Sequence, residues 1–164
     1  MHASAAIGNR GSGTHVDQER WLLCRAGSAL CALPLGQVIE TMRALPIEAV
    51  AGAPRYVRGV AIIRGVPTPV VDIARLFGGP ASRAERLVTL KIDTRVIALA
   101  VDSVLGIRLL EGIAEPLPPL LGDVANDVVS MIGRLDTELL LYLNTVRLLP
   151  QEDWERVSSL EASA

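Results

Sequence analysis

Aromatic residues make up only 3% of this 164-residue chain and charged residues only 21%, whereas hydrophobic residues make up 50%. A core with so few rings must be built from Val, Leu, Ile and Ala, and the stiff β-branched side chains among these favour strands. The net charge of −2 supplies no positive field for a phosphate backbone, so the composition excludes nucleic acid as the expected partner. The length predicts one ordinary domain, or two very small ones that share a core.

Long apolar runs are also lacking. The longest uncharged stretch, residues 26–39, has 14 residues and includes Pro34, and this is too short to cross a bilayer. Residues 1–18 contain no continuous apolar segment of the kind found in a secretory signal. We therefore expect a cytoplasmic protein with no direct membrane insertion, and we expect residues 1–18 to form a disordered tail.

Cysteine and histidine are scarce, with two residues of each. His2 and His15 both lie in the expected tail, and no Cys-x-x-Cys motif or helically spaced histidine pair occurs, so the sequence predicts no metal site. Cys24 and Cys31 flank Gly27-Ser28 and would face each other in a simple hairpin. A disulfide fits that geometry, but a reducing cytoplasm favours two buried thiols that act as small apolar residues.

The most informative feature present is a hairpin around Arg64-Gly65, which separates two apolar runs at residues 60–63 and 66–71. Glycine supplies the positive φ that a tight turn needs, so the turn exposes an arginine at its tip. With a two-residue loop, Pro67 and Pro69 fall where their missing N–H groups would point away from the partner strand. This predicts that residues 66–70 lie locally at a sheet edge, whereas a bulged loop would shift the register.

Many short β-branched runs separated by Gly, Pro and Asp turns predict an all-β fold with only short helical turns. The best internal break, residues 78–84, leaves about five short strands on each side. We therefore predict two small five-stranded β-barrels packed together, the first over about residues 19–79 and the second over about residues 84–150. Single helical turns are expected at residues 53–56, 73–77 and 146–149, and a short C-terminal helix or tail over residues 151–164.

Catalysis has one candidate pair, because Asp72 and Asp102 each follow an apolar strand run and superficially resemble paired catalytic aspartates. Neither is followed by Thr-Gly or Ser-Gly, and a strand-end carboxylate that accepts a hydrogen bond from a turn is the favoured interpretation. The sequence also contains no nucleophile elbow, phosphate loop or dinucleotide fingerprint. It thus predicts no enzyme and no cofactor, with a small hydrolase that uses Asp72 and Asp102 as the alternative.

A family resemblance is carried by residues 55–78. Their order of G-V-x-x-x-R-G, a proline-containing strand, V-V-D and L-F-G resembles the central signature of CheW-like domains. Val38-Ile39-Glu40 is similar to the V-x-E motif of that family, residues 100–104 to its V-D-x-V segment, and residues 139–149 to its closing strand and short helix. The resemblance covers roughly residues 19–150.

CheW proteins couple chemoreceptors to the histidine kinase CheA. The resemblance therefore implies two SH3-like five-stranded barrels with a groove between them, in a non-enzymatic adaptor of a bacterial chemosensory array. It implies two partners, the regulatory domain of a CheA-type kinase and the cytoplasmic tip of a chemoreceptor. It places Val38, Glu40, Gly59 and Arg64 on the receptor-binding surface. An adaptor of a non-flagellar pathway, such as surface motility or second-messenger control, is the alternative within the family.

Several roles remain open for these residues. Glu40 either contacts a receptor or pairs with Arg64 or Arg58 within the monomer, and Gly59 serves backbone geometry before it serves any close approach. The family usually has Asn-Leu where this chain has Ile62-Ile63, and Ile where it has Thr41. These departures bear on which receptor is bound.

Overall fold

The computed structural model describes residues 20–110, 115–116 and 128–162, and strands dominate them. One sheet contains β1 (Arg20–Ala26), β2 (Ala29–Pro34), β8 (Ser103–Leu109), β9 (Glu115–Pro116), β10 (Val129–Leu135) and β11 (Glu138–Leu143). The other contains β3 (Val38–Arg43), β4 (Val57–Ile63), β5 (Val66–Asp72), β6 (Arg86–Ile92) and β7 (Arg95–Val101). The helical elements are η1 (Leu35–Gln37), α1 (Ile73–Leu76), η3 (Thr145–Arg147) and α3 (Gln151–Ala162). The predicted all-β class with short helical turns is confirmed.

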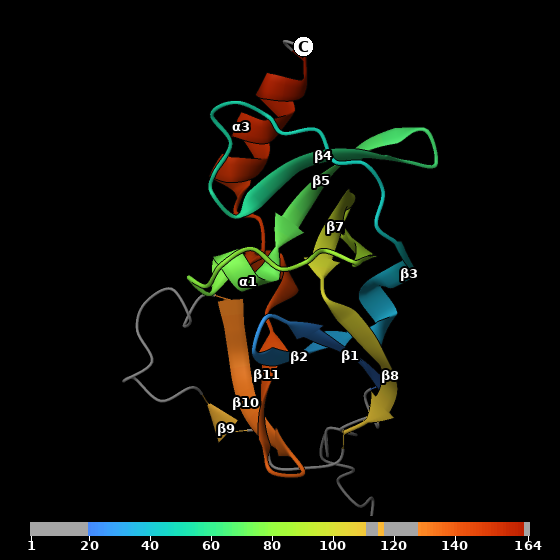
Figure 1. Ribbon diagram of the computed structural model, residues 1–164, viewed down its shortest axis with the longest axis vertical. Coiled ribbons are helices and arrows are strands. Elements are labelled where there is room, and N and C mark those ends of the chain that lie inside the picture. Colours follow the sequence, from blue (N-terminus) through green and yellow to red (C-terminus); the bar gives the residue numbers. More distant parts are fainter. Residues whose placement is uncertain (1–19, 111–114, 117–127, 163–164) are drawn as a thin grey trace, which may run out of the picture.

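The order of the strands corrects the predicted division into barrels at residues 78–84. The first sheet runs β8-β1-β2-β11-β10-β9, and the second runs β3-β6-β7-β5-β4 (Figure 1). The N-terminal hairpin thus pairs with strands from the second half of the chain, and the break between residues 79 and 84 lies inside the second sheet. Glycine and proline mark where strands end, but they carry no information about which distant strand each one pairs with.

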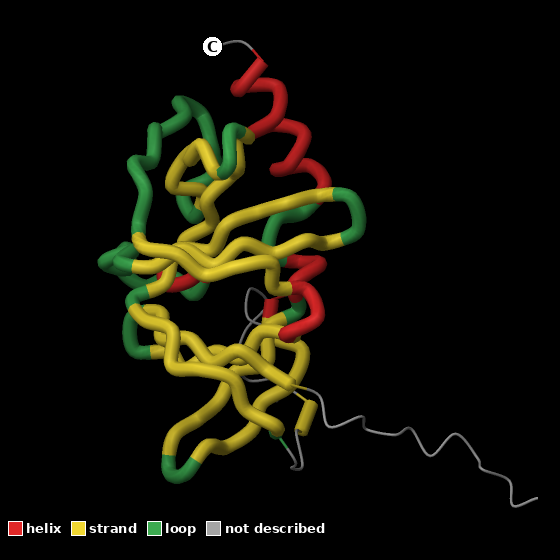
Figure 2. The backbone as a smooth tube through the Cα atoms, turned by 90° about the vertical axis from the view of Figure 1, so that its right-hand side faces the viewer, coloured by secondary structure: helices red, strands yellow, loops and turns green. Residues whose placement is uncertain are grey.

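The core has three parts, because successive side chains of a strand point to opposite faces of its sheet. In β1, Leu22 and Cys24 belong to a large cluster that draws on both sheets, whereas Leu23 belongs to a cluster confined to the first sheet. In β6, Val88 joins the shared cluster and Leu87 packs inside the second sheet. Figure 2 shows the two layers of strands, and the shared cluster draws residues from both. The two small sheets thus pack against each other, and this contact buries apolar surface that neither sheet could cover alone.

The turn between β4 and β5 has the predicted two-residue loop. Ile63 pairs with Val66, and the turn residues Arg64 and Gly65 have φ angles of 50° and 78°. Positive φ at both central positions defines a type I′ turn, whose twist matches that of the flanking strands. The backbone of the hairpin tip therefore has the regular geometry of a two-residue loop.

Pro67 and Pro69 occupy the positions predicted for them. They face β4 opposite Ile62 and Val60, and β7 pairs with β5 only at residues 70–72 among the described residues. The first half of β5 is thus a local sheet edge, as predicted.

Three local expectations have different outcomes. Residues 54–57 form a turn, closed by the Val57 N–H donating to the Pro54 carbonyl at 2.9 Å, and the helical turn predicted at residues 53–56 is wrong. The expected C-terminal helix is present as α3, whose Val157 is buried in the shared core. The expected tail at residues 1–18 lies outside the described residues.

The two cysteines lie directly opposite each other, Cys24 in β1 and Cys31 in β2, and both are free and buried. Burial raises the pKa of each thiol to about 12. A thiol with so high a pKa is almost entirely protonated at neutral pH and is a poor nucleophile. The structure therefore supports small apolar core residues over a disulfide.

Candidate functional site

The tip of the β4–β5 hairpin reaches β3 through an ion pair. The Arg64 side chain donates from Nε to Oε1 of Glu40 at 2.7 Å and from NH2 to Oε2 at 2.6 Å. Its side chain is 78% exposed, and that of Glu40 is 25% exposed. These hydrogen bonds hold the pKa of Glu40 below its ordinary value and raise the pKa of Arg64. The sequence left the partner of Glu40 within the monomer open between Arg58 and Arg64, and the structure shows that this partner is Arg64.

This ion pair also shows how the second sheet is shaped. Glu40 lies in β3, the first strand of the sheet order, whereas Arg64 follows β4, the last. A contact between them requires the sheet to curl until its two ends meet, as in a barrel. A second link at the same seam joins Glu48 to Val60, with backbone hydrogen bonds of 2.9 and 2.8 Å in the two directions.

Gly59 is explained by that seam. Its φ is 141°, and a Cβ atom at this position would lie 1.8 Å from the carbonyl oxygen of Glu48. No side chain fits there, because the obstacle is backbone. The expectation that Gly59 serves backbone geometry first is therefore confirmed, and its place on a receptor surface stays a prediction.

Val38 lies two residues before Glu40 in β3, with a register shift in the pairing with β6 between them, and packs partly buried against the shared core. The backbone N–H of Glu40 donates to Oγ1 of Thr89 at 3.2 Å, which ties β3 to β6. The structure thus brings Glu40 and Arg64 into contact with Val38 nearby along the strand. Gly59, in contrast, is buried under residues 48–49.

Arg58, the other candidate partner of Glu40, instead pairs with Asp72. The distance from its Nε to Oδ2 of Asp72 is 2.9 Å, and its NH2 donates to the carbonyl of Ser82 at 2.8 Å. Asp72 is fully buried and also accepts from the backbone N–H groups of Arg75 and Ser82, each at 3.2 Å. The carboxylate caps α1 and anchors the loop before β6, so it acts as the predicted strand-end acceptor.

Asp102 has a similar role between the sheets. Its Oδ2 accepts from the backbone N–H of Gly27 at 2.6 Å, and its Oδ1 accepts from that of Arg83 at 2.7 Å. Its own N–H donates to the carbonyl of Arg25 at 2.8 Å. The carboxylate joins the β1–β2 turn to the loop before β6. With Asp72 and Asp102 both bound by backbone donors, the hydrolase alternative loses the observation that motivated it.

One surface was missed from the sequence. The edge strand β8 exposes three alternate apolar side chains, which are Leu105 (52% exposed), Ile107 (55%) and Leu109 (51%). Exposed apolar side chains on an edge strand are typical of a surface that meets a partner. The alternation was visible in the sequence, but a buried strand face gives the same pattern, so sequence alone did not distinguish the two.

Within the described ranges, no group of three or more His, Cys, Asp or Glu residues is placed to hold a metal ion. In the same part of the chain, no helix is long and apolar enough to cross a membrane.

Comparison with known proteins agrees with this architecture. Residues 20–153 match the model of the CheW-like domain. The chemotaxis protein CheW of Klebsiella aerogenes is 23% identical over 165 residues, covering 98% of this chain and 99% of that protein. Protein FrzA of Myxococcus xanthus is 30% identical over 111 residues, covering 64% of this chain and 67% of that protein. The crystal structure of the scaffolding protein TtCheW from Thermoanaerobacter tengcongensis superposes with a TM-score of 0.72 at 21% identity, covering 82% of this chain and 94% of that one.

The fold defines the structural class of the protein, which is two small SH3-like β-domains that share one core. The chain belongs to the family of CheW-like domains, because the family model matches residues 20–153.

Proposed function

We propose that the protein is a cytoplasmic adaptor that couples a chemoreceptor to a CheA-type histidine kinase and carries out no reaction itself. Membership of the CheW-like family and similarity to a protein named chemotaxis protein CheW support this function. The observation that carries the receptor contact is the bidentate pair of Arg64 with Glu40 on an exposed hairpin tip. An exposed pair of this kind adds little to stability, so its fixed geometry is available for recognition.

The pair prepares the Arg64 side chain for binding. Glu40 takes one N–H of Nε and one of NH2, and the remaining guanidinium N–H groups make no other hydrogen bond within the described ranges. Arginine presents these donors in a planar fork that suits carboxylates and helix-end carbonyls. In our proposal the receptor tip accepts from this fork and packs against Val38, while the kinase binds other surfaces.

Coupling then follows from mass action. A protein that binds receptor and kinase together raises their effective concentration and fixes their relative orientation. The exposed stripe of Leu105, Ile107 and Leu109 on β8 offers a second, apolar surface for such an assembly.

The non-flagellar alternative differs in the identity of the partners. The similarity to FrzA keeps a second branch of the family in consideration. Ile62, which stands where the family usually has Asn, is 60% exposed and lies two residues before Arg64. This exposure supports our proposal that Ile62 alters which receptor is bound.

Titration calorimetry tests the proposal with the regulatory domain of the CheA-type kinase encoded nearest to this gene, and with the cytoplasmic fragment of a receptor. We expect saturable binding of each partner without ATP or metal, and simultaneous binding of both. Absence of binding to either partner at high micromolar concentration would contradict the adaptor function. An Arg64→Ala variant should lose receptor binding and keep kinase binding.

A further inference from the structure

A cavity of about 440 Å³ lies between the start of β7 and the start of α3. Its apolar floor includes Ile97, 2% exposed, and Leu149, 5% exposed, and its rim includes Val146, 60% exposed. None of the residues proposed for receptor binding lines it. A ligand bound in this cavity would therefore be distinct from the receptor contact proposed above.

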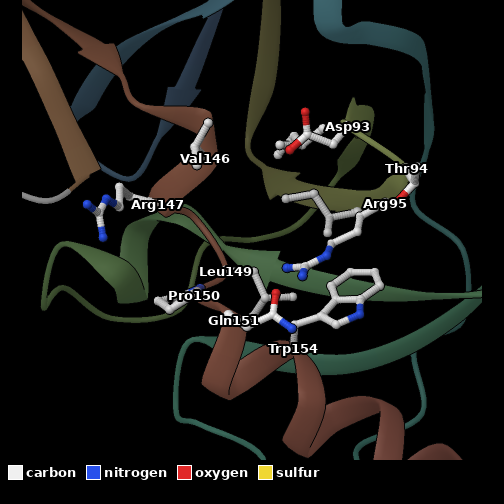
Figure 3. Close-up of a pocket in the computed structure, with 11 residues that line it drawn as sticks. Asp93, Thr94, Arg95, Val146, Arg147, Leu149, Pro150, Gln151 and Trp154 are labelled. Carbon is white, nitrogen blue, oxygen red and sulfur yellow. The ribbon is translucent and has the colours of Figure 1, made fainter.

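Arg95 is the distinctive group in this cavity. Its guanidinium carbon lies 5.2 Å from the centre of the Trp154 ring. Figure 3 shows the two side chains together beside Leu149 and Gln151, with Arg147 pointing away from them. Within the part of the chain that the structure describes, the side chain of Arg95 makes no hydrogen bond or ion pair. The guanidinium is held over the ring and its N–H donors are unused, so it is available to bind a carboxylate.

Both walls of the cavity are anchored. On one side, Arg95 begins β7, which pairs along its whole length with β6. On the other, α3 is held by Val157 in the shared core and by the hydroxyl of Tyr56, which donates to the carboxylate of Asp153. A cavity between two fixed walls loses little entropy when a ligand enters.

The lining narrows the chemistry of the occupant. The charged side chains that line the cavity are Arg95, Arg147 and Asp93, and Arg147 points away from Arg95 (Figure 3). The guanidinium of Arg95, which has no ion-pair partner among the described residues, favours an anionic group, and the floor favours an aliphatic one. Because Arg95 already covers one face of Trp154, that face is closed to a nucleobase or an ammonium group.

We propose that this cavity binds a segment of a partner protein in which a glutamate or aspartate directly follows an aliphatic residue. The carboxylate accepts from Arg95, and the aliphatic side chain lies against Ile97 and Leu149. The exposed rim at Val146 lets the peptide backbone continue across the surface on both sides.

Peptide titrations followed by NMR and by tryptophan fluorescence test this assignment, with blocked tetrapeptides Ala-Leu-Glu-Ala, Ala-Leu-Gln-Ala and Ala-Ser-Glu-Ala as probes. We expect Ala-Leu-Glu-Ala to shift the indole signal of Trp154 saturably and to bind about ten-fold tighter than either of the others, the scale of one charge-assisted hydrogen bond or one buried aliphatic group. The signal of Trp21, which packs against Tyr142 in the first sheet, should not move.

Arg95→Gln should remove the preference for Glu over Gln in the probe. Arg86→Gln is the matched control, because Arg86 and Arg95 lie at opposite ends of the β6–β7 hairpin and both substitutions remove one positive charge. Melting curves and amide spectra verify that each variant is folded. The proposal is overturned if no probe binds saturably, if the Glu and Gln peptides bind equally, or if both variants weaken binding alike. Equal binding of inorganic phosphate, or a Trp154 shift that depends on protein concentration without peptide, would also overturn it in favour of a general anion site or self-association.

Discussion

Two arginines six residues apart on the same hairpin form ion pairs of the same chemistry in opposite surroundings. Arg58 pairs with Asp72, whose side chain is fully buried, whereas Arg64 pairs with Glu40 at a tip where its own side chain is 78% exposed. The buried carboxylate of Asp72 also accepts two backbone hydrogen bonds. Among the described residues, the carboxylate of Glu40 accepts hydrogen bonds only from Arg64, whose own side chain is mostly in solvent.

The two pairs differ in burial and not in chemistry, so we expect burial to decide how much each pair contributes to folding. A buried ion that loses its partner leaves an uncompensated charge in a medium of low dielectric constant. An exposed ion that loses its partner is solvated by water at little cost. In our proposal, Arg58 and Asp72 serve folding, and Arg64 and Glu40 serve partner binding.

The largest expected effect comes from breaking the buried pair. Arg58→Ala should lower the free energy of unfolding by about 3–5 kcal/mol, because Asp72 stays buried without its counter-charge. Urea denaturation followed by circular dichroism measures this loss. Arg64→Ala, the matched variant on the same hairpin, should shift the melting temperature by no more than about 2 °C. Similar losses in the two variants would refute the comparison.

The next effect concerns the seam that brings Glu40 and Arg64 together. Gly59→Ala should cost about 2–4 kcal/mol, because it combines a strained positive φ with a clash against the backbone of Glu48. Gly65→Ala is the control, since that turn also has a positive φ but a Cβ atom there meets nothing within 4 Å. Denaturation midpoints should rank Gly59→Ala well below Gly65→Ala, and an equal cost for both would mean that the close approach at the seam is unimportant.

The smallest effect is the pH dependence of the exposed pair. The pKa of Glu40 is lowered, first of all by the hydrogen bonds from Arg64, so its contribution to stability is present above the unfolded-state pKa of about 4.3 and is lost as the pH falls through the folded-state pKa. The small difference in melting temperature between wild type and Glu40→Gln should therefore shrink as the pH falls through the folded-state pKa of Glu40.

Glu138 provides a comparison for this titration. Arg25 lowers its pKa in the same way, by hydrogen bonds at another exposed site. Glu138→Gln should show the same pH window as Glu40→Gln. A difference that grows toward acid pH in either variant would contradict the direction of the pKa shifts.

Much of this fold could be predicted because its information is local. Runs of β-branched residues identified most strands, the Arg64-Gly65 dipeptide identified the tight turn, and the position of Asp72 and Asp102 after strands indicated that they accept backbone hydrogen bonds. Each of these features depends on a few neighbouring residues. Local geometry was therefore enough to predict them.

The rest depends on contacts between distant segments. Nothing near residues 20–34 indicates that β2 lies parallel to β11, because that pairing arises only when both halves of the chain pack together. The choice of Glu40 between Arg58 and Arg64 depends on the curl of the second sheet, and the cavity at Trp154 depends on where α3 packs. For that reason, the sequence left the partner of Glu40 open and did not predict the β2–β11 pairing or the cavity.

A double-mutant cycle on Arg64 and Glu40, read out in both melting temperature and receptor affinity, tests the central claim most directly. Arg64→Ala, Glu40→Gln and the double variant should each melt within about 2 °C of the wild type. Receptor affinity should fall about ten-fold or more in Arg64→Ala, as expected for the loss of a charged contact at an interface, with kinase affinity unchanged. A marked loss of melting temperature with receptor affinity retained would show that the pair is structural and that the receptor binds elsewhere.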